Sequence, residues 1–467
     1  MSSSDVQLIA IALGSVIFLV ALIVSRIRLH PLIALLIIST AVGFLTGMPE
    51  NKLIKSIASG AGGTLGAVGL VVALGAMLGK ILADTGVTEG ISDTIIRNTS
   101  TRLLPWAMAG AAFIIGIPMF FEVGLVVLLP LIFSVARKLE ATQSVRGSAY
   151  VYVGVPVIAA LASMHGMVPP HPGPLTAIAA LNTNIGATML YGFIAAIPAI
   201  VLGGPVYGAL ITPRLKVQPD QALIDQFSAA SGKVVRNAEQ GGTPPGLGIS
   251  LLTALLPAIL MLLHAITELV FPKDATIVRV TDFVGSPTIA MLIGVLFAAW
   301  VLVYARHGDA EKLRDSLGAS LKPVAGILLI IAGGGAFQQV LTDAKVGDAI
   351  VHLTQAFALP PLVLGWMISM LLSVSTGSAT VGIVGASGLL APLAGADATL
   401  NLPLLALSIG CGSLFFNYAN HAGYWMVKES FGMTMGEATK TISVVQSIVA
   451  VVGLGMVLLM NLLPPLA

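Results

Sequence analysis

Long apolar segments alternate with short polar ones along the whole chain of 467 residues. A helix needs about 20 apolar residues to cross the hydrocarbon core of a bilayer. Apolar segments recur from one end of the chain to the other, roughly at residues 6–25, 31–48, 64–83, 105–134, 148–164, 175–183, 189–212, 249–271, 288–305, 323–342, 360–395, 402–418 and 440–462. The pattern therefore predicts an all-α polytopic membrane protein.

Two of these segments are too long for a single span. Residues 105–134 and 360–395 carry turn-forming and polar residues in their middles, at GIPMFFEVG (116–124) and SVSTGSATVGIVGASG (373–388). Non-helical backbone at membrane depth is tolerated only where it is buried in protein or lines a cavity. We therefore expect each segment to form a re-entrant hairpin of two short helices.

Two further segments have the pattern of broken transmembrane helices. The stretch HGMVPPHPGP (165–174) places four prolines inside segment 148–183, and proline lacks the N–H that a helix interior needs. Segment 402–430 is interrupted in a similar way. The polar residues around the two breaks are Ser163, His165, His171 and Asn182 in the first, and Ser413, Asn417, Asn420 and His421 in the second. We expect the breaks to expose backbone groups and imidazoles to a cavity.

The distribution of Lys and Arg orients the chain. If loop 26–30 is cytoplasmic and neither hairpin crosses the membrane, five loops on that side hold fifteen Lys and Arg residues, against five on the other side. Positive charge favours the cytoplasmic side. Both termini then lie on the non-cytoplasmic side, and the polar segment 213–248 is a cytoplasmic linker. Because MSSSDVQ lacks basic residues, we expect the first span to be retained rather than removed as a signal peptide.

The two halves of the chain show a weak internal repeat. Residues 69–87 align without gaps to 328–346, which pairs Asp84 with Asp343. His165 and His421 follow at nearly the same spacing. The orientation above makes 1–212 and 249–467 inverted-topology repeats, each with a hairpin and a broken helix. Paired discontinuous segments in inverted repeats are typical of secondary transporters, with the site near the midplane.

Composition excludes several other classes of function. The chain is 56% hydrophobic and 9% charged, with a mean hydropathy of +0.97, and its net charge of +2 gives no reason to expect nucleic acid as a partner. Cys411 is the single cysteine, so an internal disulfide is impossible and no metal site is predicted. Neither an ATP-binding nor a protease motif occurs, so we expect no enzyme activity and no cofactor.

The hairpin middles hold the first candidate site residues. Glu122 is the one carboxylate that the pattern places well inside an apolar segment, beside Phe120 and Phe121, and a buried carboxylate is a candidate for proton coupling. The alternative is a structural Glu bonded to backbone N–H groups. The facing middle offers hydroxyl and N–H groups for a carboxylate or polyol at Ser375, Thr376, Ser378 and Thr380. These residues are also typical of a small-residue helix interface.

The broken helices hold the second group of candidates. His165, His171, Asn417, Asn420 and His421 would face the cavity and bind substrate, with His165 as the second proton-coupling candidate. A histidine within the membrane is often only hydrogen-bonded between helices, and this alternative stays open. Lys80 lies near the end of its span, where its side chain is expected to reach the interface.

At these residues the sequence resembles the gluconate permease family, whose members are proton-coupled symporters of gluconate and related acids. The resemblance runs essentially end to end and is carried by IPMFFEVGLVVLLPL (117–131), HGMVPPHPGP (165–174), GSATV (377–381) and NHAGYW (420–425). It implies a multi-pass protein of a bacterial inner membrane with periplasmic termini. It also implies a sugar-acid anion and protons as partners, with Phe121 among the residues near the substrate. Whether the protein forms a homodimer is left open.

Three alternatives differ in substrate or mechanism. The substrate of a proton symporter of this kind is a sugar acid or another small hydroxy or amino acid such as D-serine. An anion channel would instead have a continuous pore, often lined by rings of like charge. A proton antiporter that exports Na⁺ would need several intramembrane carboxylates, whereas the apolar pattern supplies only Glu122.

Overall fold

The architecture comes from a computed structural model of the chain. It describes residues 3–24, 26, 28–87, 90–91, 94, 99–117, 119, 121–219, 245–272, 274–346, 349, 360–396, 399–418 and 421–464. Within these residues every regular element is a helix, so the all-α prediction is confirmed. Most of the expected linker 213–248 lies outside the described residues.

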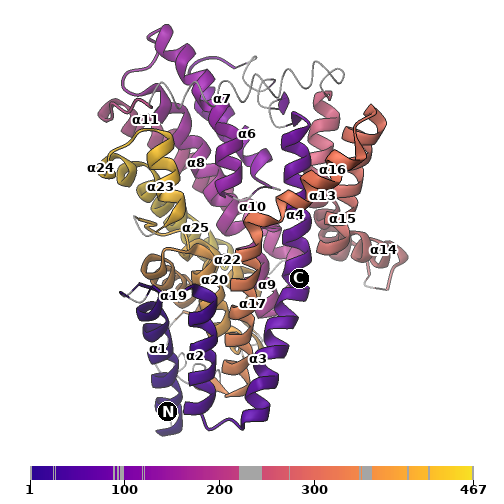
Figure 1. Cartoon of the computed structure of the whole chain (residues 1–467), viewed down its shortest axis with the longest axis vertical. Coiled ribbons are helices and arrows are strands. Elements are labelled where there is room, and N and C mark those ends of the chain that lie inside the picture. Colours follow the sequence, from indigo (N-terminus) through magenta and orange to yellow (C-terminus); the bar gives the residue numbers. More distant parts are fainter. Residues whose placement is uncertain are drawn as a thin grey trace.

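The first half of the chain contains the amino-terminal helices seen at the lower end of Figure 1 and the helices that lead to the first break. They are α1 (Ser3–Val24), α2 (Pro31–Leu45), α3 (Glu50–Thr64), α4 (Leu70–Asp84), α6 (Leu104–Gly116), α7 (Phe121–Ala141), α8 (Ala149–Met167), α9 (Pro172–Leu181), α10 (Ile185–Val201) and α11 (Tyr207–Ile211). A π-helical turn at Leu65–Gly69 joins α3 to α4.

The second half begins with helices that pack beside α4, on the right of Figure 1, and ends with helices that pack on α8 and α10. They are α13 (Leu247–Val270), α14 (Thr276–Gly285), α15 (Pro287–Ala298), α16 (Ala310–Ser320), α17 (Lys322–Asp343), α19 (Pro361–Thr376), α20 (Ala379–Leu390), α21 (Leu393–Ala396), α22 (Leu402–Gly412), α23 (Ala422–Ser430), α24 (Met435–Ala438) and α25 (Val444–Met460).

Six helical stretches in the described part of the chain are long and apolar enough to cross a membrane. They are Asp5–Ile23, Ala149–Leu181, Ile185–Arg214, Leu247–Glu268, Pro287–Arg306 and Met435–Met460. Shorter apolar helices, among them α6, α19, α20 and α22, pack between them. By length and composition the long stretches can supply the spans of a polytopic protein, and one of them, Ala149–Leu181, contains the first expected break. The short helices named here belong to the expected hairpins and to the second break.

Both overlong segments are divided into two helices. The first is α6 and α7, separated at 117–120, and the second is α19 and α20, separated at Gly377 and Ser378. Gly377 has φ +71°, a backbone conformation that glycine adopts without the clash of a side chain. Helices α19 and α20 pack directly, because a Cβ atom on Gly382 would lie 2.8 Å from the carbonyl oxygen of Ser369. That the two pairs are re-entrant in a bilayer stays a prediction.

Both polar segments interrupt their helices. The first break separates α8 from α9 at 168–171, and the second separates α22 from α23 at 413–421. Pro172 is favourable where it stands because the first position of a helix needs no N–H partner. The two helices before the breaks cross at Gly166 and Gly410, where a Cβ atom on Gly410 would lie 2.0 Å from the Gly166 carbonyl oxygen. This close crossing places the two breaks near each other.

Two reciprocal polar contacts join the halves. The Ser56 hydroxyl of α3 donates to the Asp343 carboxylate of α17 at 2.6 Å, and the Ser316 hydroxyl of α16 donates to the Asp84 carboxylate of α4. The aspartates are the pair that the weak repeat aligns, and the serines stand in almost the same relation along the chain. The helix packing shows the same correspondence, because α2 packs on α17 while α15 packs on α4, the helix that the repeat aligns with α17. These contacts agree with paired repeats, and their inverted orientation stays a prediction.

Candidate functional site

Each hairpin contacts the broken helix of the other half. A Cβ atom on Gly423, in the first turn of α23, would lie 3.1 Å from the Phe121 ring at the start of α7 and equally close to the His421 ring. On the other side, a Cβ atom on Gly173 of α9 would lie 2.4 Å from Ile383 of α20. The structure thus brings together the hairpin ends and the breaks that the sequence singles out.

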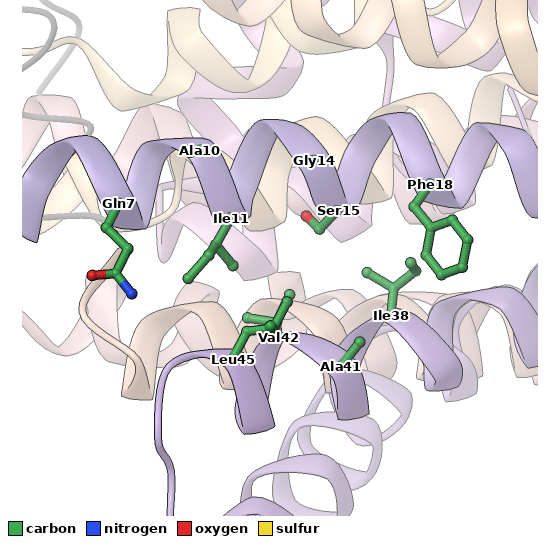
Figure 2. Close-up of a pocket in the computed structure, with 10 residues that line it drawn as sticks. All are labelled: Gln7, Ala10, Ile11, Gly14, Ser15, Phe18, Ile38, Ala41, Val42 and Leu45. Carbon is green, nitrogen blue, oxygen red and sulfur yellow. The ribbon is translucent and has the colours of Figure 1, made fainter.

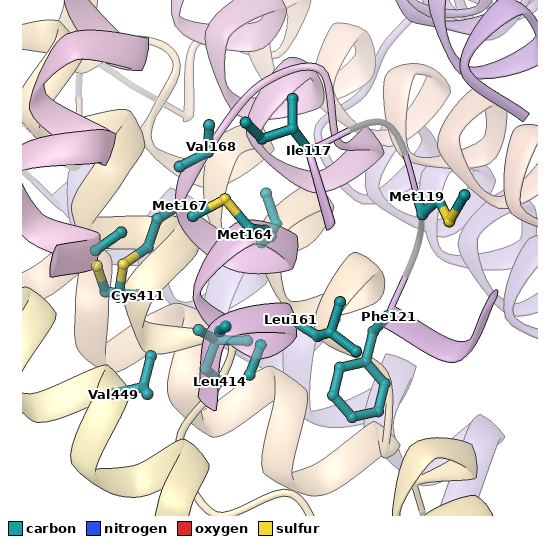
Figure 3. Packing of buried hydrophobic residues seen from close by; sticks show 14 of the residues in the cluster. Ile117, Met119, Phe121, Leu161, Met164, Met167, Val168, Cys411, Leu414 and Val449 are labelled. Atoms are coloured by element: carbon teal, nitrogen blue, oxygen red, sulfur yellow. The ribbon is translucent and has the colours of Figure 1, made fainter. Parts of the chain in front are cut away.

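Buried apolar side chains fix the first of these contacts. Leu161 of α8 packs against both Gly116, at the end of α6, and Gly124, near the start of α7. Phe121, with a 2% exposed surface, lies next to Leu161 in the packed cluster of Figure 3. The start of α7 is therefore held in the core rather than at the surface.

His165 and His171 lie together at the first break. His165 is in the last turn of α8 and His171 precedes α9, and their ring centroids are 5.8 Å apart in an edge-on arrangement. The Nε2 atom of His171 is 2.9 Å from the carbonyl oxygen of Gly116. A carbonyl only accepts hydrogen bonds, so Nε2 carries the proton and donates. His171 thereby satisfies a carbonyl at the C-terminus of α6, where intrahelical partners run out.

His421 marks the second break. It is 8% exposed and precedes α23, and its Nδ1 atom accepts a hydrogen bond from the backbone N–H of Gly423 at 3.1 Å. In the neutral ring this bond leaves the proton on Nε2. His421 thus caps a helix while its ring lies against Gly423, the residue that the Phe121 ring also approaches.

The second hairpin presents hydroxyl groups at its turn. Ser378 precedes α20 and its Oγ atom accepts from the N–H of Val381 at 3.3 Å, which is an ordinary N-cap. Thr380 lies in the first turn of α20 and is partly buried. Ser375 and Thr376 form the last turn of α19, and their side chains lie outside the described part of the structure. In this capping role Ser378 Oγ is an acceptor, so its O–H group can still serve as a donor.

Asn417 connects the second break to two helices. It is 1% exposed, its Oδ1 atom accepts from Ser373 of α19 at 3.2 Å, and its backbone carbonyl accepts from the hydroxyl of Ser443 at 2.6 Å. Its Nδ2 donor has no partner among the described residues. Asn420 lies outside the described residues.

Glu122 is the second residue of α7, so its backbone lies in the first turn of the helix. A carboxylate there is favoured by the positive end of the helix dipole. Its side chain lies outside the described part of the structure.

The structure adds a polar network that sequence reasoning missed. Glu268 of α13 accepts from Asn184 at 2.9 Å, and His264 lies 3.8 Å from Glu268 and 3.6 Å from Asp282. Glu268 lies near the end of the apolar helix α13, so it adds a carboxylate at a helix end rather than one well inside an apolar segment. The signal available in the sequence was the four-residue spacing of His264 and Glu268, which places both on one helix face. Lys80 pairs with Asp84 at 2.5 Å, one turn further along α4, and that it reaches the interface stays a prediction.

A groove of about 370 Å³ lies between α1 and α2. Figure 2 shows its lining, which is apolar except for Gln7 and Ser15. The Ser15 hydroxyl is already used, since it donates to the carbonyl of Ala12 at 2.6 Å. None of the lining residues belongs to the predicted site, and the groove has too few polar groups to hold a hydroxylated anion.

Comparisons with known proteins decide the class. The family model of the GntP family permeases matches residues 6–463, which is nearly the whole chain. The chain belongs to the GntP permease family. It is 39% identical to the gluconate permease of Pseudomonas aeruginosa over 460 residues, covering 98% of this chain and 99% of the relative. It is 38% identical to the high-affinity gluconate transporter of Escherichia coli over 455 residues, covering 97% and 99%.

A solved structure supports the fold. Neisseria gonorrhoeae MtrF, described as one of a class of antimetabolite efflux pumps, superposes with a TM-score of 0.65 at 11% identity, covering 93% of this chain and 96% of that one. At this identity the likeness concerns the fold alone. Together with the apolar helices, the family makes this GntP-family protein a multi-pass membrane transporter and not an enzyme. The resemblance noted from the sequence motifs is thereby confirmed.

Proposed function

We propose that this GntP-family protein takes up gluconate or a closely related sugar acid together with protons, by alternating access. The observation that carries the proposal is the end-to-end match to relatives named for gluconate, combined with two polar helix breaks whose preceding helices cross at Gly166 and Gly410. A single hydroxylated anion needs many donors and acceptors, and these breaks supply them in a chain that is otherwise apolar.

The carboxylate of the substrate is assigned to the turn of the second hairpin. Ser375, Thr376, Ser378 and Thr380 surround the N-terminus of α20, where backbone N–H groups lack helical partners and favour an anion. The hydroxyl groups are assigned to His165, His171, Asn417, Asn420 and His421, with Phe121 against the carbon chain. The position of His421 and Phe121 against Gly423, and the Asn417 donor that no described residue pairs, support this assignment.

Proton coupling is assigned to Glu122, with His165 as the second candidate. Cotransport of a monovalent anion with one proton is electrically neutral, whereas more protons would add a dependence on membrane potential. A proton needs a carrier to cross the low-dielectric interior, and a carboxylate at a hairpin turn near the substrate can gain and lose one as the cavity opens to either side. The buried position of the neighbouring Phe121 supports this placement.

Alternating access is assigned to a movement of the two halves relative to each other. The reciprocal contacts of Ser56 with Asp343 and of Ser316 with Asp84 support two structurally related units around a central site. Residues 1–212 and 249–467 form these units, joined by the cytoplasmic linker 213–248. In a bacterial inner membrane both termini then face the periplasm.

Uptake into proteoliposomes tests the function. Purified protein is reconstituted and supplied with labelled gluconate, other aldonates or D-serine, with and without an imposed pH gradient. We expect accumulation of a sugar acid above its equilibrium level only when the outside is acidic. Accumulation of D-serine alone would show that the substrate is an amino acid rather than a sugar acid. Flux that never exceeds the equilibrium set by the substrate's own electrochemical gradient would instead indicate an anion channel.

A further inference from the structure

Three buried polar side chains lie on the second helix break and on two helices tied to it. Ser369 of α19, Asn417 and Gln446 of α25 have exposed fractions of 0%, 1% and 2%. Within the described residues, Ser369 Oγ, Asn417 Nδ2 and Gln446 Oε1 have no hydrogen-bond partner. An enclosed polar atom left unsatisfied is destabilising, so native proteins nearly always pair it. These three atoms therefore indicate a ligand or ordered water that completes them.

Helices α19 and α25 are tied at two levels. At one level, Trp366 Nε1 donates to the carbonyl of Ala450 at 3.1 Å. At the other, Asn417 accepts from Ser373 of α19 and from Ser443, which directly precedes α25. On each helix the two levels are about two turns apart. The helices therefore run antiparallel along the same stretch.

Ser369 and Gln446 fall between these two levels. Each lies three positions after one tied residue and four before the other, Trp366 and Ser373 in the first case and Ser443 and Ala450 in the second. Residues at these spacings share one face of a helix. Ser369 and Gln446 thus lie between the two ties, each about one turn from a residue that donates a hydrogen bond to Asn417.

The hydroxyl of Ser369 behaves unlike that of its neighbour in the hairpin. Ser387 of α20 is equally buried, and its hydroxyl donates to the Ile383 carbonyl of its own helix at 2.6 Å. Ser369 makes no such bond among the described residues. It also lies close to α20, since a Cβ atom on Gly382 would be 2.8 Å from its carbonyl oxygen. Ser369 thus lies within the second hairpin, on the helix that leads to the turn to which the substrate carboxylate is assigned.

We infer that Ser369, Asn417 and Gln446 form one site that binds a hydroxyl group of the substrate. A hydroxyl both donates and accepts, which matches the free Gln446 acceptor and the free Asn417 donor. The three side chains are uncharged, so the site suits a neutral group rather than the carboxylate. The inference rests on the proposed function, because it is the carbon chain of a sugar acid that supplies such hydroxyls. A water molecule offers the same chemistry, and the experiment separates the two.

The test measures binding of gluconate and of a series of deoxy-gluconates, each lacking one hydroxyl, by titration calorimetry on the purified full chain. Gln446→Met keeps the length of the side chain and removes the acceptor. We expect it to weaken gluconate binding about tenfold, as for a lost buried hydrogen bond. One deoxy analogue should bind wild type and variant equally, because it lacks the hydroxyl that Gln446 contacts. Ser369→Ala should give the same pattern, and Ser387→Ala should leave all affinities unchanged.

Each outcome has a defined meaning. An equal loss for every analogue, with the melting temperature preserved, would assign the site to water and overturn the substrate contact. Wild-type affinity in both Gln446→Met and Ser369→Ala would also overturn it, and either variant suffices if the other does not fold. Failure of the proposed function is distinguishable, because the wild-type protein would then bind no sugar acid at all.

Discussion

At the scale of single residues, the proposal depends most on the charge of Glu122 at the start of α7. Glu122→Gln mimics the protonated carboxyl group, so the variant should still bind substrate and exchange it across the membrane. It should lose accumulation driven by a pH gradient, which proteoliposome uptake measures against counterflow exchange. Glu50→Gln, the same change at an exposed helix start, should retain both activities.

Retained gradient-driven accumulation in Glu122→Gln would remove Glu122 from the coupling mechanism. The same pair of assays on His165→Asn would then decide whether the histidine carries the proton. His171 is a less suitable carrier, because its Nε2 proton is held by the Gly116 carbonyl.

At the scale of helices, the crossing of α8 and α22 is the contact that brings the breaks together. A side chain at Gly410 has no room, since its Cβ atom would lie 2.0 Å from the Gly166 carbonyl oxygen. Gly410→Ala should force the helices apart and destabilise the protein by about 1–3 kcal/mol, the usual range for overpacking. A thermal melt in detergent and an uptake assay measure this. Gly455→Ala on α25, where nothing lies within 4 Å, is the control and should melt like wild type.

A wild-type melting temperature and uptake rate in Gly410→Ala would show that the two breaks do not depend on this crossing.

The same pair of helices shows what the sequence could and could not predict. Proline content located the break at 168–171, because proline removes a backbone donor wherever it occurs. The partnership of Gly166 with Gly410 joins distant residues, and local chemistry does not specify such a contact. Helix α3 was not predicted, because its sequence has no continuous apolar run. It is buried by a distant part of the chain, helix α17, with Gly60 against Gly335.

At the scale of the whole molecule, the reciprocal serine–aspartate contacts lead to a test of topology. Lys52 lies one helical turn before Ser56, and Lys312 lies one turn before Ser316, so the two lysines are equivalent if the halves are repeats. Inverted repeats require equivalent positions to lie on opposite membrane faces. Lys52 then faces the periplasm and Lys312 the cytoplasm. Both side chains are exposed, and Cys411 is the single cysteine and fully buried, so introduced cysteines will give a clean signal.

An impermeant maleimide added to intact cells should therefore label Lys52→Cys and leave Lys312→Cys unlabelled until the membrane is opened. Lys55→Cys, exposed three residues further along α3, should follow Lys52→Cys. The excess of Lys and Arg on one side of the membrane identifies that side as cytoplasmic. The pairing of Asp84 with Asp343 is the reason to expect the two lysines on opposite sides. Labelling of both lysine positions from the same side would mean that the repeats are parallel. The two halves would then not exchange roles across the membrane, and the proposed alternating access would need another origin.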